Sequence, residues 1–295
     1  MSLRFCHLVA FASVVALFAG LATPAPAAPP VVKKQVQNIG FKMSYTEAGS
    51  QDAEAVIFLH GFTDSSYSWS MTAPLLAGEY RIFALDLRGF GDSERPEWGY
   101  TIPQFAEDVV AFMDALQIKQ ATLIGHSMGT FVAHQIGWVY PERVKKLVLV
   151  SSAMTCVRNA TLMDVYKTVG ASSFRDPISS DFIRAWQTGP NPVPEDFFSV
   201  ILQETAKPPA RVWKAALRGL LGDDHGAFLK NIAAPTLIIW GDKDTCFLRA
   251  DQDSLLKAIP GAVLKVHNGA GHNVQWEKGR DEELAKDIRA FLKKK

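Results

Sequence analysis

From residue 41 to residue 292, short apolar runs alternate with longer amphipathic segments. Runs such as Ala55–Leu59 and Lys146–Val150 are rich in aliphatic residues, which is typical of strands buried on both faces of a parallel sheet. The pattern predicts strands over Phe41–Glu47, Ala55–Leu59, Arg81–Leu85, Ala121–Gly125, Lys146–Val150, Thr236–Trp240 and Val263–His267.

Helical patterns fill the intervals between several of these strands. In Ile102–Leu116, the residues Phe105, Val109 and Phe112 recur three or four positions apart, so one face of the segment is apolar. Helices are likewise predicted over Met128–Tyr140, Asp251–Ile259 and Glu282–Leu292. Because strands alternate with helices, we expect an α/β fold with a mostly parallel central sheet flanked by helices on both faces.

The alternation is interrupted between about residues 153 and 231. This stretch contains no convincing buried strand, but it is rich in proline and in aromatic residues such as Phe182, Trp186 and Trp213. We interpret it as a helical insertion between two strands, placed over one end of the sheet. The expected organisation is therefore a core formed by residues 28–152 and 232–295, with a helical insertion over residues 153–231.

The N-terminus has the pattern of an export signal. Arg4 supplies a positive charge, Leu8–Leu21 is an apolar run, and Ala25-Pro26-Ala27 fits the small-x-small rule for signal-peptidase cleavage. We predict a signal peptide over residues 1–27 and export to the periplasm or the exterior. The alternative is a retained membrane anchor, but the apolar run is shorter than the roughly 20 residues that a spanning helix needs, so no stable anchor is expected.

Charge and cysteine content exclude several functional classes. Lys and Arg number 31 against 30 Asp and Glu, so the formal net charge is +1, which gives no electrostatic footprint for nucleic acid. Beyond Cys6, which lies in the predicted signal, the chain has Cys156 and Cys246. No Cys-x-x-Cys pair or Cys/His cluster indicates a metal site, and we expect neither a metal nor a cofactor.

A candidate nucleophile lies between a predicted strand and a predicted helix. The segment Gly125-His126-Ser127-Met128-Gly129 has the pattern Gly-x-Ser-x-Gly, in which small flanking residues allow a sharp turn that presents the serine hydroxyl. The pattern alone is weak, because an ordinary glycine-rich turn can match it. Its position after a strand and before a helix favours the catalytic interpretation.

A serine hydroxyl needs a base, and the base needs an acid to orient it. His272 follows the last predicted strand in a loop of small residues, although a lone loop histidine is more often only solvated. Asp244 follows the strand Thr236–Trp240, so the chain order is Ser, Asp, His. Asp242 is the competing acid, and its alternative role is to accept hydrogen bonds from a local turn.

Two backbone N–H groups are candidates for an oxyanion hole. His60-Gly61-Phe62 follows the strand Ala55–Leu59, which places the N–H of Phe62 beside the nucleophile, while the N–H of Met128 lies at the predicted start of a helix. We expect His60 itself to be structural. The glycines within 86–93 lack the third Gly and the Lys-Ser/Thr ending of phosphate-binding loops, so we expect a turn held by Asp86 and Arg88 instead.

Together these segments resemble the α/β-hydrolase superfamily, from about residue 41 to residue 292. The matching segments are His60-Gly61-Phe62, Asp86-Leu87-Arg88-Gly89-Phe90-Gly91-Asp92-Ser93, Gly125-His126-Ser127-Met128-Gly129, Gly241-Asp242-Lys243-Asp244 and Gly271-His272. The resemblance implies that the acid is the second Asp of the Gly-x-x-Asp segment, Asp244, and that the insertion is the family's helical cap.

The sequence is most similar to the branch that holds epoxide hydrolases, haloalkane dehalogenases, carbon–carbon bond hydrolases and small esterases. The first two use Asp as nucleophile where this chain has Ser127, and the cap offers only Tyr166 where epoxide hydrolases have two tyrosines. Phe62 also departs from the His-Gly-Gly-Gly loop of esterases for bulky lipids. The family often has Pro after the acid, whereas here Thr245 to Leu248 contains none.

The resemblance and the residues predict a serine hydrolase that cleaves a small apolar ester through an acyl-enzyme, with Ser127, His272 and Asp244 as its triad and the N–H groups of Phe62 and Met128 as its oxyanion hole. The aromatic insertion predicts an apolar pocket of the size that holds a drug-like molecule. Three alternatives use the same residues: a carbon–carbon bond hydrolase, a cofactor-free perhydrolase, and a ligand receptor with little turnover.

The two remaining cysteines are expected close together. Cys156 and Cys246 each follow the carboxyl end of a predicted strand, on either side of the insertion, and in this family those strands are neighbours. They either form a disulfide, which an exported protein would favour, or remain two thiols.

Overall fold

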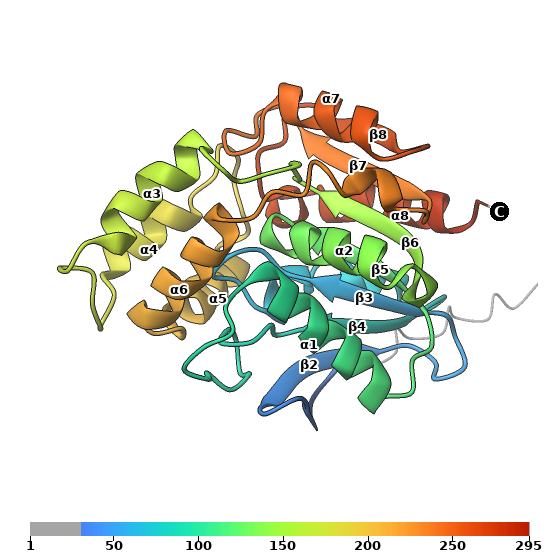
Figure 1. The fold of residues 1–295 in the computed structure, drawn as a ribbon, viewed down its shortest axis with the longest axis horizontal. Coiled ribbons are helices and arrows are strands. Elements are labelled where there is room, and N and C mark those ends of the chain that lie inside the picture. Colours follow the sequence, from blue (N-terminus) through green and yellow to red (C-terminus); the bar gives the residue numbers. More distant parts are fainter. Residues whose placement is uncertain (1–30, 295) are drawn as a thin grey trace, which may run out of the picture.

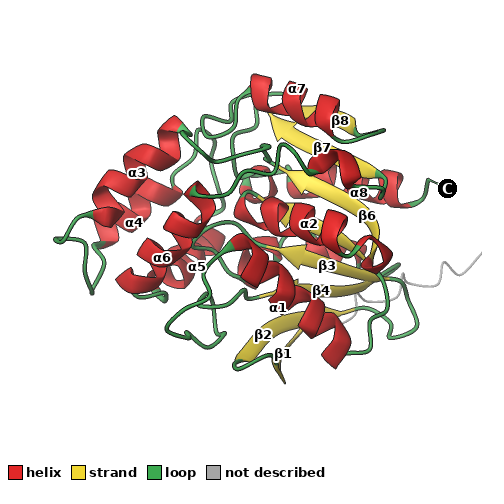
Figure 2. Ribbon diagram, in the orientation of Figure 1, coloured by secondary structure: helices red, strands yellow, loops and turns green. Residues whose placement is uncertain are grey.

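A computed structural model of the protein describes residues 31–294. It contains an eight-stranded sheet with the strand order β1-β2-β4-β3-β5-β6-β7-β8 (Figures 1 and 2). The strands are β1 (Val32–Gln37), β2 (Lys42–Ala48), β3 (Ala55–Leu59), β4 (Arg81–Leu85), β5 (Ala121–His126), β6 (Val144–Val150), β7 (Thr236–Gly241) and β8 (Val263–His267). β2 pairs antiparallel with both β1 and β4, and all other neighbours are parallel. The predicted mostly parallel sheet is confirmed.

The seven predicted strands are present, with ends that differ by at most two residues. β1 was missed, and its sequence Val-Lys-Lys-Gln-Val-Gln explains why. It lies at the edge of the sheet with nearly every side chain exposed, so it carries no apolar run. Its lysines are typical of edge strands, where charge disfavours pairing with another chain.

Helices cover both faces of the sheet. α1 (Ile102–Ala115), α2 (Met128–Val139) and α7 (Arg249–Ala258) pack on one face, and α8 (Asp281–Leu292) packs on the other with the short 3-10 helices η1 (Ser66–Trp69) and η2 (Ala73–Leu76). These two layers form the two large apolar clusters of the core. The apolar stripe of α1 is buried as its spacing predicts, and the Thr101 side chain caps its first turn by accepting from the Gln104 N–H.

Four helices lie between β6 and β7, where the sequence predicts a helical insertion. They are α3 (Ala160–Gly170), α4 (Ser180–Gln187), α5 (Glu195–Ala206) and α6 (Ala210–Leu221). They gather at the end of the sheet toward which the parallel strands point (Figures 1 and 2). Their aromatic side chains meet the core there, since the Phe62 ring lies 5.5 Å from Trp213 and 5.9 Å from Trp186 between centroids. We call this group of helices the cap.

The predicted export signal over residues 1–27 lies outside the described residues and stays a prediction. Between residues 31 and 294, no helix combines the length and apolar character needed to cross a bilayer.

Cys156 and Cys246 are both free thiols, so the disulfide that we considered is not formed in this structure. Cys156 is fully buried, and burial raises the pKa of its thiol well above the ordinary value, with the charges of Cys246 and Asp223 acting in the same direction. A buried thiol with a raised pKa behaves as a small apolar side chain rather than as a nucleophile.

Candidate active site

Ser127 stands on a strained turn between β5 and α2. Its backbone has φ 48° and ψ −118°, a conformation that costs a residue other than glycine about 1–3 kcal/mol. The turn is held from below, because the Ser127 N–H donates to the carbonyl of Val150 at 3.0 Å. Strain of this kind persists only where the surroundings enforce it, and here it lifts the hydroxyl out of the sheet toward the cap.

The glycines of this turn are required by close backbone contact. A Cβ on Gly125 would lie 2.5 Å from the carbonyl oxygen of Gly129, and a Cβ on Gly129 would lie 2.3 Å from the carbonyl oxygen of Leu59. Both distances are far below van der Waals contact, and the opposing atoms are backbone atoms that cannot move aside. The turn therefore packs against β3 only because these positions lack side chains.

Replacing Gly129 with Ala is expected to lower the free energy of unfolding by about 3 kcal/mol, because the new methyl group overlaps the β3 backbone. Gly78→Ala is the matched control, since Gly78 is exposed and a Cβ there meets nothing within 4 Å. Urea denaturation of both variants measures the difference. Equal stabilities would show that the contact between the turn and β3 is not tight.

The structure brings His272 and Asp244 together. The Nδ1 atom of His272 lies 2.9 Å from Oδ2 of Asp244, although 28 residues separate them in sequence. Asp244 is only 4% exposed, and its other oxygen accepts hydrogen bonds from the backbone N–H groups of Cys246 and Phe247, at 2.8 and 3.0 Å. A carboxylate held in this way fixes the imidazole tautomer with the proton on Nδ1 and a free Nε2.

Asp242, the competing acid, has the other role that the sequence allowed. Its side chain is exposed, and Oδ1 accepts the N–H of Gly269 at 2.6 Å, so that it ties the loop after β7 to the loop after β8. Among the contacts of the described residues, the ring of His272 has its hydrogen bond with Asp244 and none with Asp242.

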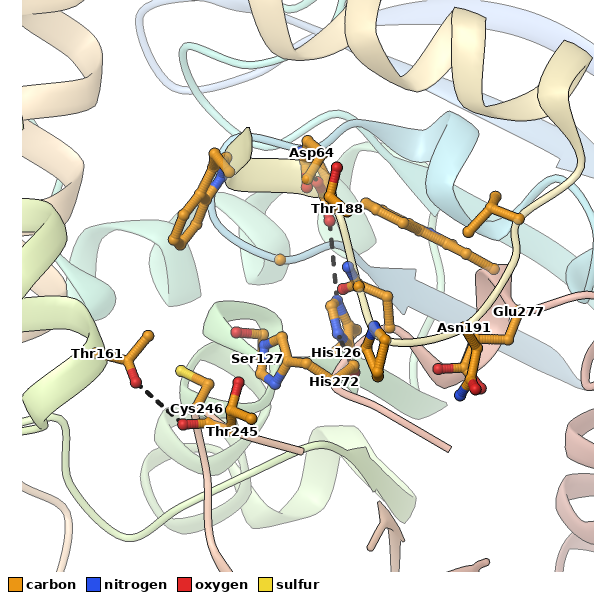
Figure 3. Close-up of a pocket in the computed structure, with 18 of the residues that line it drawn as sticks. Asp64, His126, Ser127, Thr161, Thr188, Asn191, Thr245, Cys246, His272 and Glu277 are labelled. Carbon is orange, nitrogen blue, oxygen red and sulfur yellow. Dashed lines mark hydrogen bonds and ion pairs between the residues drawn. The ribbon is translucent and has the colours of Figure 1, made fainter. Parts of the chain in front are cut away.

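Ser127 and His272 line the same cavity (Figure 3). The structure records no hydrogen bond between the Ser127 hydroxyl and the His272 ring among the described residues. Contacts between nucleophile and base are often long in the absence of substrate and shorten when it binds. The geometry therefore places the hydroxyl and the imidazole in one cavity without closing the contact between them.

The environment of His272 favours the protonated form of its ring more than water does. Burial favours the neutral ring, but the charge of Asp244, its hydrogen bond to Nδ1 and the charge of Asp64 outweigh burial and raise the pKa of His272 above 6.5. A base with a pKa close to the working pH is the most effective proton acceptor.

The cavity has a volume of about 260 Å³ and lies between the sheet and the cap. Its wall is partly apolar, with Phe62, Trp186 and Trp276 among its side chains, and partly polar. Figure 3 shows polar groups around Ser127 and His272. The polar residues in the wall of the cavity are Asp64, His126, Thr161, Thr188, Asn191, Thr245 and Glu277. The cavity is therefore mainly apolar, as the aromatic residues led us to expect, but it is smaller than a typical drug-sized pocket and has polar groups around Ser127 and His272.

The two candidates for the oxyanion hole, Phe62 and Met128, both have backbone N–H groups near Ser127. Phe62 lines the cavity beside Ser127, and Met128 is the first residue of α2, whose N–H has no partner within the helix. The turn after Gly61 is held by a hydrogen bond from the Asp64 N–H to the Gly61 carbonyl at 3.2 Å. No backbone hydrogen bond in the described chain uses the N–H of Phe62 or Met128.

His60 is structural, as expected. It is fully buried, its Nε2 accepts the Leu87 N–H at 3.0 Å, and its Nδ1 donates to the Gly61 carbonyl at 2.7 Å. Burial lowers the pKa of His60 to about 4, so the ring is neutral and links the oxyanion loop to the chain after β4.

The turn after β4 differs from our expectation in one respect. Asp86 does hold the turn, by accepting the N–H groups of Ser66 and Asp92 at 2.7 and 2.9 Å. Arg88, however, binds the buried Asp108 of α1 through two hydrogen bonds of 2.7 and 2.6 Å, and makes no ion pair with Asp86. Nothing in the spacing of the sequence pointed to Asp108.

Asp64 is the cavity residue that the sequence analysis missed. It is 3% exposed, and burial raises the pKa of its carboxyl to about 7, although a hydrogen bond from Gln187 and the charge of His272 act in the opposite direction. It belongs to no recognisable motif, and only the folded chain brings it beside the catalytic loop.

One group of side chains outside the cavity has the composition of a metal site. The possible ligand atoms of His267, Glu283 and Asp287 lie within 4.8 Å of one another, between β8 and α8. The Nε2 atom of His267 lies 3.0 Å from Oδ2 of Asp287, and its Nδ1 atom lies 3.8 Å from Oε2 of Glu283. The two carboxylates therefore face different nitrogens and are paired with Lys265 and Arg280, as in a charge network.

Comparison with known families places most of the chain in one family. A family described as alpha/beta hydrolase fold matches residues 54–279. The dihydrolipoyllysine-residue acetyltransferase component of the acetoin cleaving system from Cupriavidus necator is 30% identical over 277 residues, which cover 86% of this chain and 66% of that protein. The chain thus spans slightly less than two thirds of this relative.

Two further similarities cover nearly the whole of the compared proteins. The uncharacterized hydrolase YugF from Bacillus subtilis is 28% identical over 270 residues, which cover 86% of this chain and 95% of that protein. The crystal structure of the enol-lactonase from Burkholderia xenovorans LB400 superimposes with a TM-score of 0.78 at 20% identity, and the match covers 88% of this chain and 100% of the enol-lactonase. At this identity the structural match supports the fold alone.

Proposed function

The chain belongs to the α/β-hydrolase fold family, which includes hydrolases among its relatives, and we propose that it is a serine hydrolase that cleaves ester-like bonds through an acyl-enzyme. The observation that carries the proposal is the 2.9 Å hydrogen bond between His272 and the buried Asp244, in a cavity that also contains the strained Ser127. An oriented base beside an exposed hydroxyl is the requirement for serine nucleophilic catalysis.

In the proposed reaction, the Ser127 oxygen attacks the acyl carbon while Nε2 of His272 takes the hydroxyl proton. The N–H groups of Phe62 and Met128 bind the oxyanion, and each such donor contributes about 3 kcal/mol to stabilising the transition state. The C–O bond to the leaving group then breaks, and His272 returns the proton to the leaving alkoxide. Water, activated by the same histidine, hydrolyses the acyl-enzyme and regenerates Ser127.

The cavity supports a preference for short acyl groups. Its volume of about 260 Å³ is at or below the lower limit of about 300 Å³ for small-molecule pockets. A panel of p-nitrophenyl esters of increasing acyl length tests both the activity and the size limit. We expect kcat/KM to be highest for the short acyl chains and to fall once the chain fills the cavity; a lack of turnover across the whole panel would contradict ester hydrolysis.

We expect kcat/KM for the favoured ester to fall as the pH is lowered, with an acid limb above pH 6.5. His272 must be neutral to accept a proton, and the two nearby carboxyl groups, Asp244 and Asp64, raise its pKa. Protonation below this pKa removes the base, so activity is lost on the acid side. A pH profile of kcat/KM measures the limb. A profile that stays flat well below pH 6.5 would exclude His272 as the base.

We further propose that the chain is exported through residues 1–27 and that residues 153–231 act as the cap of the active site. The basis is the sequence pattern for the first proposal and the position of α3 to α6 over the cavity for the second. Fractionation of cells that express the full chain, followed by N-terminal sequencing of the product, tests export.

A further inference from the structure

A second acid and a second histidine lie in the wall of the cavity, directly behind the catalytic histidine. Asp64 and His126 are 3% and 1% exposed. The Asp64 Oδ1 atom accepts a hydrogen bond from Gln187 of α4 at 3.1 Å, and its Oδ2 atom lies 3.8 Å from Nδ1 of His126. Figure 3 marks this contact between the two labelled side chains.

The tautomer of His126 follows from its other nitrogen. Nε2 lies 3.1 Å from the backbone carbonyl of His272, and a carbonyl only accepts hydrogen bonds, so Nε2 carries a proton. Burial lowers the pKa of His126 well below 6.5, with the charge of His272 acting in the same direction, so the ring is neutral. Nδ1 is therefore a bare acceptor, and it is buried without a hydrogen-bond partner.

An ionised Asp64 would make this arrangement unfavourable. The backbone N–H of Gly61 can donate to the carboxylate, but neither carboxylate oxygen can donate to the buried Nδ1 of His126, and a buried polar group without a donor costs about 1–3 kcal/mol. A proton on Oδ2 removes the conflict, because a small side-chain rotation lets the acid donate to Nδ1 while Oδ1 keeps the hydrogen bond from Gln187. The neutral acid thus gives the Nδ1 of His126 a donor, which the carboxylate cannot do.

We propose that Asp64 is a positioning residue that carries a proton in the resting enzyme and directs it at His126, which in turn holds the backbone of the catalytic His272. The link to the catalytic group is short. The rings of His126 and His272 are 5.1 Å apart between centroids, and the His272 carbonyl that His126 binds also accepts the Ser151 hydroxyl at 2.7 Å. Asp64 and His126 therefore hold the loop that carries His272 in place.

The charge state of Asp64 also affects the base. The titratable groups around Asp64 are His126 and His272, and those around His272 are Asp244, Asp64 and His126. Burial raises the pKa of Asp64 to about 7, and the pKa of His272 is raised above 6.5, so the charge of each group affects the titration of the other. A negative Asp64 stabilises the imidazolium, and removal of that charge lowers the pKa of His272.

The protonation state is tested directly by infrared difference spectroscopy, without any substrate. At about pH 5.5 an ordinary Asp, with a pKa of about 3.9, is ionised, whereas Asp64 is expected to be protonated. The spectrum of wild type minus Asp64→Asn should contain a carbonyl band of a protonated carboxylic acid, which disappears as the pH rises through 7. A carboxylate band at pH 5.5 in its place would overturn the proposal, whether or not the protein is an esterase.

The positioning role is tested with two variants of Asp64. Asn imitates the neutral acid, since its amide donates to His126 and accepts from Gln187, so Asp64→Asn should keep kcat within about threefold of wild type. Asp64→Leu has a similar size and no donor, and we expect it to lower kcat about tenfold by loosening the His272 loop. This kinetic part rests on the proposed function. If Asp64→Asn and Asp64→Leu have the same kcat, Asp64 does not position His272 and the proposal is wrong.

The titration of His272, followed by NMR of its ring, separates this role from a purely structural one. In wild type, Asp64 loses its proton as the pH rises through about 7, so the titration curve of His272 should be broadened by that coupling, and in Asp64→Asn it should narrow to the curve of a single group at somewhat lower pH. Asp253→Asn is the control, since Asp253 is exposed on α7 and pairs only with Arg249, and it should leave the titration unchanged. A wild-type curve as narrow as that of Asp64→Asn and displaced to higher pH, as a permanently ionised Asp64 would give, would overturn the proposal. If Asp64→Leu does not fold, the infrared band and this titration decide.

Discussion

Replacement of Ser127 by Ala is expected to lower kcat for ester hydrolysis by about four orders of magnitude or more. The reason is chemical, because no other hydroxyl on the strained turn can form the acyl-enzyme. The Cβ and therefore the backbone strain at φ 48° are retained, so the variant should unfold at the same denaturant concentration as the wild type. Steady-state kinetics on the best ester of the panel, with urea denaturation in parallel, measures both properties.

Ser199→Ala is the matched control, because Ser199 is an exposed serine of α5 whose hydroxyl bonds only within its own helix. It should keep the activity of the wild type. A Ser127→Ala variant that retains ester hydrolysis within tenfold of wild type would show that another residue is the nucleophile, and the proposed mechanism would be wrong.

Asp244→Asn is the second change for which we expect a large effect, a loss in kcat of about 10³–10⁴-fold. The amide cannot hold the Nδ1 proton of His272 as the carboxylate does, so the imidazole loses both its tautomer and the charge that stabilises its protonated form. The same substitution should move the acid limb of kcat/KM to lower pH, because Asp244 is the larger of the two charges that raise the pKa of His272.

Asp242→Asn provides the comparison. Asp242 lies two residues away in sequence but is exposed, and its Oδ1 atom accepts a hydrogen bond from the backbone N–H of Gly269. Its conversion to Asn keeps an acceptor for that N–H, so kcat should stay within about threefold of wild type. If Asp242→Asn were the damaging variant and Asp244→Asn the mild one, the observed hydrogen bond to His272 would not be the catalytic one.

The buried strands could be predicted from sequence because burial on both faces demands a run of apolar residues. Ala55–Leu59 and Arg81–Leu85, which are largely buried, have the same limits in the sequence prediction and in the structure. β1 could not be found in this way, because an edge strand with exposed side chains has no such run. Its place in the sheet is decided by backbone pairing with β2, which leaves no signature in hydrophobicity.

The candidate catalytic residues were found because each follows a strand that the pattern reveals. Ser127 lies after β5, Asp244 after β7 and His272 after β8, and parallel strands bring their carboxyl ends to one edge. Asp64 follows β3 at the same edge, but an acid in a loop is usually solvated, and its burial depends on the cap residue Gln187. The local sequence contains no trace of that contact.

By itself, the sequence determined the order of the strands with apolar runs and of the helices between them, the sharp glycine turn and the three candidate catalytic positions, because these depend on local periodicity and on motifs of a few residues. Only the tertiary structure decided that Asp244 and not Asp242 meets His272, that the cavity is small and partly polar, and that Asp64 faces His126. Those outcomes depend on distances between segments far apart in the chain, and burial of a polar group is settled by what the rest of the fold places around it.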